Sequence, residues 1–83
     1  PPLSEERRRE FVKMAKSRAE DAKVSVRNAR RDANDMLKSA QKDGDISEDE
    51  EKRGLKSIQD LTDGYVKECD EVCSKKEAEI MEV

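Results

Sequence analysis

Apolar and small residues recur at helical spacing through the first half of the chain. Successive members of this stripe lie three or four residues apart: Phe11, Ala15, Ala19, Ala22, Val26, Ala29, Ala33, Leu37 and Ala40. Such spacing places side chains on one face of an α-helix. Ser4 is a suitable N-cap for this helix, and Pro1 and Pro2 predict an extended approach to it. We therefore predict a helix over about residues 4–42.

A second helical stripe runs through the other half and consists of Leu55, Ile58, Leu61, Tyr65, Cys69, Val72 and Ile80. Between the two stripes, Gly44 is a natural C-terminal stop for the first helix. Ser47 and Glu50 have the S-x-x-E spacing of a capping box, which starts a new helix. The sequence thus predicts a turn over about residues 43–46 and a helix over about 47–82. A connection this short makes two long helices antiparallel neighbours.

The composition indicates an all-α chain that is short of core material. Of the 83 residues, 47% are charged, 33% are hydrophobic and 2% are aromatic, as in long helices or coiled coils. Many stripe residues of the first helix are alanines, so an antiparallel pair buries too little apolar area to offset the entropy of ordering it. We expect a third helix to cover the pair. Gly54 and Gly64 lie inside the second helix, where each costs about 1 kcal/mol relative to alanine.

Charge is divided unevenly between the two halves, although the net charge is only -3. Residues 1–42 hold 12 basic and 7 acidic side chains, whereas residues 43–83 hold 6 and 14. On a helical wheel centred on Val26, the basic residues of the first helix gather between roughly 40° and 140°. This cationic strip consists of Arg9, Lys16, Lys23, Arg27, Arg30, Arg31 and Lys38.

The cationic strip has two interpretations. A solvated face would pair its cations with acids three or four residues away, and the acidic second helix can satisfy some of them within the fold. Against this, most acids of the first helix lie elsewhere on the wheel, at roughly 160° to 240°. Segregated arginines and lysines suit nucleic-acid phosphates, which guanidinium groups bind bidentately. The strip therefore favours RNA or DNA binding without excluding the solvated face.

Other chemistry has little support in the sequence. The chain contains no histidine, no glycine-rich phosphate loop and no serine beside a plausible base, so we expect no enzymatic activity, cofactor or small-molecule substrate. Cys69 and Cys73 share one helix face, but no further cysteine or histidine completes a metal site. We interpret them as reduced, structural residues, and Tyr65 as a core residue. No apolar run approaches the length of a membrane span.

Five sequence blocks, in this order, resemble the carboxy-terminal part of the ribosome recycling factor family. They are PPLSEERRREFVK at the start, VRNARRDAND in the first helix, GDISEDEEKR at the turn, IQDLTDGYVKECDEV in the second helix and KEAEIMEV at the end. The resemblance covers all 83 residues. No single block would be specific, but five at the expected spacing are.

The resemblance implies a three-helix bundle, of which residues 1–83 would supply the second and third helices. The first bundle helix and an inserted β-rich domain would then be missing from this chain. It also implies a monomer that binds large-subunit rRNA of post-termination ribosomes and, with elongation factor G, splits them into subunits. The rRNA contacts carried over by position are Arg30 first, then Arg27 and Arg8. Arg31 and Lys23 are added from the cationic strip.

Two other functions and the compartment remain open. A coiled-coil adaptor hairpin would bind a partner helix through its alanine-rich face. A binder of DNA or of unrelated RNA would share the cationic strip but not the ribosome. The resemblance implies a bacterial cytoplasmic protein or, alternatively, one of the chloroplast stroma or mitochondrial matrix.

Overall fold

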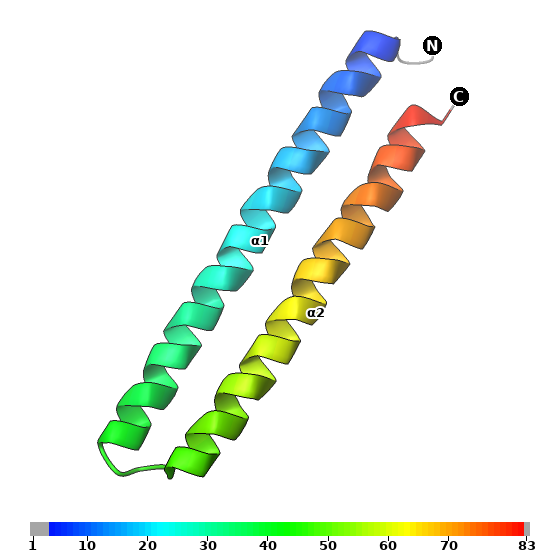
Figure 1. The fold of residues 1–83 in the computed structure, drawn as a ribbon. Helices are drawn as coiled ribbons and strands as arrows, with labels where there is room; N and C mark the ends of the chain where they lie inside the picture. The colour runs from blue at the N-terminus through cyan, green and yellow to red at the C-terminus, as the bar shows by residue number, and fades with distance from the viewer. Residues whose placement is uncertain (1–3, 83) are drawn as a thin grey trace.

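The chain folds into a hairpin of two long helices. The computed structural model describes residues 4–82, in which α1 spans Glu5–Lys42 and α2 spans Glu48–Met81. The helices lie side by side and antiparallel, so that the start of α1 and the end of α2 are at the same end of the molecule (Figure 1). The all-α prediction is confirmed, and the helix ends fall within one residue of the predicted bounds. The extended approach predicted for Pro1 and Pro2 lies outside the described residues.

Both helices begin with side-chain caps. The Arg7 backbone N–H donates to the Ser4 hydroxyl (3.2 Å) at the start of α1. At the start of α2, the Glu50 backbone N–H donates to the Ser47 hydroxyl, and the Glu50 carboxylate accepts from the Ser47 backbone N–H, each at 3.1 Å. These bonds satisfy backbone donors that have no partner inside the helix. The predicted capping box is thus confirmed.

The turn ends α1 through a left-handed glycine. Gly44 has a φ of 81°, a conformation that costs other residues a steric penalty. Its backbone N–H donates to the Gln41 carbonyl (3.0 Å), and the Asp45 N–H donates to the Ala40 carbonyl (2.8 Å). These two hydrogen bonds together form a Schellman motif. It reverses the chain within five residues and sets where α2 begins.

A close backbone approach explains Gly54. A Cβ atom added at this position would lie 2.8 Å from Leu37 Cδ1, so a side chain here would push against α1. The sequence showed only the cost of this glycine to the helix, whereas the structure shows that it lets α2 approach α1. Gly64 has open space at the same position, and we find no structural reason for it.

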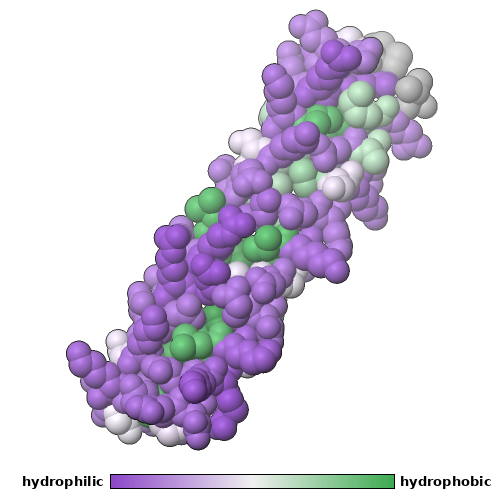
Figure 2. Space-filling model, viewed as in Figure 1, coloured by the Kyte–Doolittle hydropathy of each residue, from purple (hydrophilic) through white to green (hydrophobic). Residues whose placement is uncertain are grey.

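The hairpin is elongated and thinly packed. Its radius of gyration is 18.8 Å, against about 12 Å for a compact chain of this length. Among residues 4–82 no hydrophobic residue is buried, and Thr62 is the only buried residue. Apolar atoms appear on the surface as separate patches between charged side chains (Figure 2). Neither described helix is long and apolar enough to cross a membrane.

Candidate nucleic-acid interface

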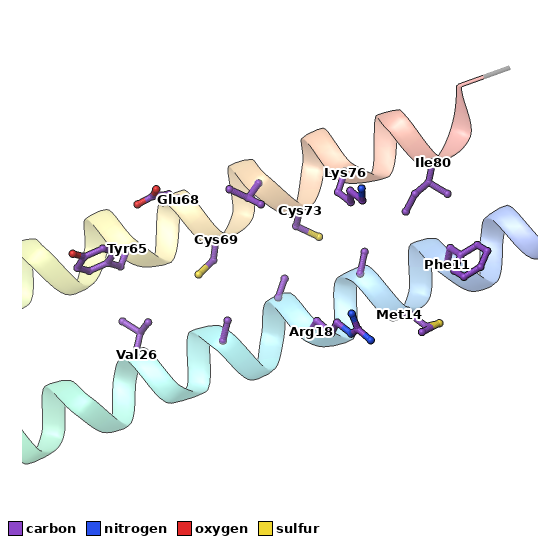
Figure 3. Close-up of a pocket in the computed structure, with 14 residues that line it drawn as sticks. Phe11, Met14, Arg18, Val26, Tyr65, Glu68, Cys69, Cys73, Lys76 and Ile80 are labelled. Carbon is purple, nitrogen blue, oxygen red and sulfur yellow. The ribbon is translucent and has the colours of Figure 1, made fainter.

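One long side of the hairpin is an apolar groove between α1 and α2. The groove has a volume of about 840 Å³, and Cys69 and Cys73 point from α2 toward α1 along it (Figure 3). Both cysteines are free thiols and partly buried, as predicted. Tyr65, predicted to be a core residue, is instead 52% exposed. The reason is that nothing within residues 4–82 covers this side of α2.

The cationic strip runs along one edge of α1, and part of it faces α2. Arg30 also lines a second, smaller hollow between the helices, together with Leu61 and Tyr65. Lys16 Nζ lies 3.3 Å from a Glu77 carboxylate oxygen. Lys23 Nζ lies 2.8 Å from Asp70 and 2.7 Å from Glu20, and its side chain is only 13% exposed. These two lysines therefore join the helices, which is the internal pairing that the acidic second half allowed.

The environment of Lys23 stabilises its charged form. Hydrogen bonds to Asp70 and then Glu20 raise the pKa of the Lys23 ammonium above its ordinary value, and this gain outweighs the opposing effect of desolvation. A charge held between two carboxylates has little left to offer a phosphate. Lys23 thus remains a predicted rRNA contact, but its position favours a structural role.

Arg30 contacts α2 differently. Its Nη1 donates to Gln59 Oε1 at 3.4 Å, and Gln59 Nε2 in turn donates to Asp63 Oδ1 at 2.8 Å. Among residues 4–82, Arg30 forms no ion pair with a carboxylate. Arg30 as a residue is partly buried, and its guanidinium is held on one side by a neutral amide and still carries an uncompensated charge.

Arg27 and Arg31 are exposed, and neither takes part in any ion pair formed within residues 4–82. On the helical wheel they lie within about 100° of Arg30, so the three guanidinium groups share one edge of α1. This cluster of Arg27, Arg30 and Arg31, hereafter the arginine cluster, can offer bidentate donors to neighbouring phosphates. It is the part of the strip best suited to bind nucleic acid.

Arg8 is separate from the arginine cluster. It lies 22 residues before Arg30 on the same helix, a distance of about 33 Å along the axis. It is partly buried, and the neighbouring Arg7 guanidinium stacks 5.5 Å from the centre of the Phe11 ring. A joint site with Arg30 would therefore require a ligand that extends along most of α1.

Sequence reasoning missed Gln59. A single neutral glutamine on a charged helix face carries no signal by itself. The available signal was the repeat of Asp63, Asp70 and Glu77 at seven-residue intervals, which would have placed α2 acids opposite the cations of α1. Only the pairing of the two helices shows that Gln59 lies beside Arg30.

The chain is similar to one protein family along its length. A family model described as ribosome recycling factor matches residues 1–81. Proteins named ribosome-recycling factor from Oleidesulfovibrio alaskensis and Bacillus subtilis are each 58% identical to it over 83 residues, and one from Halalkalibacterium halodurans is 55% identical. Each alignment covers 100% of this chain and 45% of the relative. The chain thus spans less than half the length of these curated relatives.

Proposed function

This chain belongs to the ribosome recycling factor family, and we propose that it is the rRNA-binding helical part of such a factor. In this proposal α1 binds large-subunit rRNA of post-termination ribosomes. The complete polypeptide, a monomer in the bacterial cytoplasm, then splits the ribosome together with elongation factor G. The observation that carries the rRNA-binding step is the arginine cluster, which the acids of α2 leave unpaired.

The charges on the two helices support this assignment. The acids of α2 neutralise Lys16 and Lys23 directly, while Arg27 and Arg31 remain exposed. Within the cationic strip, the arginine cluster and Lys38 are the cations that form no ion pair among residues 4–82. Each phosphate that such a group neutralises releases counterions and adds to affinity at low salt.

The groove supports a third helix supplied by the rest of the polypeptide. Large apolar side chains along it are exposed, including Val72 at 62% and Tyr65 at 52%, although soluble proteins rarely expose long apolar surfaces without a partner. The chain covers 45% of its relatives, so ample sequence exists elsewhere in the family to form such a helix. A three-helix bundle would bury the groove and leave the cationic edge free.

The experiment that tests the proposal is cosedimentation of the full polypeptide with large ribosomal subunits at two or more salt concentrations. Arg30→Ala should weaken binding roughly tenfold or more and reduce the salt slope by about 1, because one guanidinium–phosphate contact is lost. Arg53→Ala is the matched control, since it removes an exposed arginine of α2 outside the strip. Equal binding and equal slope for parent and Arg30→Ala would remove Arg30 from the interface.

A coiled-coil adaptor is the second candidate, and the uncovered groove is the observation that favours it. An adaptor would bind a partner helix in the groove and would have no need of the arginine cluster. In the same experiment it would stay in the supernatant at every salt concentration.

A further inference from the structure

Acids on α2 repeat with the same period as the cations on α1. Lys16, Lys23 and Arg30 are seven residues apart, and so are Glu77, Asp70 and Asp63 in the opposite direction. We refer to these six residues as the charge ladder. In antiparallel helices, seven residues correspond to two turns on each side, so the three cations meet the three acids at the same level.

The third rung of the charge ladder differs from the first two. Lys16 pairs directly with Glu77 at 3.3 Å, and Lys23 pairs directly with Asp70 at 2.8 Å. The corresponding pair, Arg30 with Asp63, does not form. Gln59 lies between them, accepting from Arg30 through Oε1 and donating to Asp63 through Nε2.

This interruption has a chemical consequence for Arg30. A carboxylate bound bidentately to a guanidinium would neutralise its charge and occupy the face that suits a phosphate. The Gln59 amide oxygen instead accepts from a single guanidinium N–H of Arg30, at 3.4 Å, and carries no negative charge. At the same time the Gln59 amide N–H donates to the Asp63 carboxylate. Without this hydrogen bond, the carboxylate would be free to approach Arg30.

We propose that Gln59 is a positioning residue that keeps Asp63 away from Arg30 and so preserves the arginine for an RNA phosphate. The inference rests on the proposed function, because it assigns Gln59 a role only if Arg30 contacts rRNA. Gln59 itself need not touch the RNA. Gln59 affects RNA affinity only by holding Asp63, so removal of Asp63 should cancel the effect of removing Gln59.

The test measures large-subunit affinity of the full polypeptide across a salt series. Gln59→Ala should weaken binding by roughly threefold to tenfold, because Asp63 then pairs with Arg30. Gln59→Met, which keeps the side-chain length without a hydrogen-bonding group, should behave in the same way. Gln59→Ala combined with Asp63→Ala should restore the parental affinity and salt slope, since the competing carboxylate is gone.

Asp60→Ala provides the matched control for Asp63→Ala. Asp60 lies on the same helix but pairs with Lys56 (2.9 Å) rather than with Gln59. Removing either acid makes the protein less negative by the same amount, so a nonspecific charge effect would let Asp60→Ala restore binding as well. Only Asp63→Ala should rescue Gln59→Ala if the acid acts through Arg30.

Several outcomes would overturn the inference. They are unchanged affinity of Gln59→Ala, failure of Asp63→Ala to rescue it, or equal rescue by Asp60→Ala. In an Arg30→Ala background, Gln59→Ala should have no further effect, and a further loss would also contradict the inference. If Arg30→Ala alone leaves affinity unchanged, the proposed interface fails; if it weakens binding while Gln59→Ala does not, only the role of Gln59 fails.

Discussion

The two long sides of the hairpin differ in what they still lack. On the groove side, apolar residues such as Val72 and Tyr65 are more than half exposed, and nothing among residues 4–82 lies over them. On the cationic edge, Lys16 and Lys23 are already paired with acids of α2. One side needs a covering partner to be stable, whereas the other is largely complete and displays a few selected charges.

This difference indicates separate roles for the two sides. An exposed apolar surface contributes to folding only when it is buried, at about 25 cal/mol per Å². Exposed guanidinium groups contribute little to folding, but they bind phosphate from solution. We therefore expect changes in the groove to alter stability, and changes in the arginine cluster to alter RNA affinity.

The largest effect is expected in the groove. Val72→Asp should lower the free energy of unfolding of the full polypeptide by about 3 kcal/mol or more, since a third helix would bury an unpaired carboxylate. Val24→Asp is the control, because Val24 is similarly exposed at 51% but does not line the groove. Urea unfolding measures both variants, and equally small losses would mean that the groove stays open.

An intermediate effect is expected along the cationic edge. Arg31→Ala should weaken large-subunit binding by roughly tenfold, because an unpaired guanidinium is lost. Lys23→Ala should change it by less than about threefold, since Glu20 and Asp70 already balance that charge. Cosedimentation of both variants under identical salt conditions compares their affinities for the large subunit. A larger loss of affinity for Lys23→Ala than for Arg31→Ala would contradict the structural role assigned to Lys23.

The smallest effect is a pH dependence confined to the cationic edge. The pKa of Lys23 is raised above 10.5 in the folded chain by its bonds to Asp70 and Glu20. Its contribution to stability is therefore complete below about pH 10.4 and is lost as pH rises through the folded pKa. In urea unfolding, the stability difference between the parent and Lys23→Met should be the same at about pH 8 and about pH 10, and smaller at about pH 11.5. The difference between the parent and Val72→Ala should not, because no titrating group is removed.

The helices and their ends were predictable because their signals are local. The stripe of three- and four-residue steps, Gly44 at the turn and the Ser47–Glu50 capping box each act within a few residues. The structure agrees with all of them. The missing cover over the groove was also predictable, because the alanine-rich stripe cannot bury enough area by itself.

The division of the cationic strip was not predictable from α1 alone. A helical wheel gives the direction of Lys23 and Arg30 but not which residue of α2 lies opposite, and that depends on how the helices are paired. The close approach of Gly54 to Leu37 was missed for the same reason, since it exists only between helices. Properties that arise from the contact of two elements cannot be derived from either element separately.

The charge ladder would not by itself determine how the helices align. Sliding one helix by a single heptad would bring Arg9 opposite Glu77, Lys16 opposite Asp70 and Lys23 opposite Asp63, again three matched pairs. The two alignments therefore have the same number of opposite-charge pairs, and electrostatic attraction alone does not distinguish them. The Schellman turn at Gly44 and the cap at Ser47 remove that ambiguity. In the alignment that they select, Asp63 faces Arg30 rather than Lys23. The geometry of a five-residue turn thus decides which cation is left without a carboxylate partner on α2.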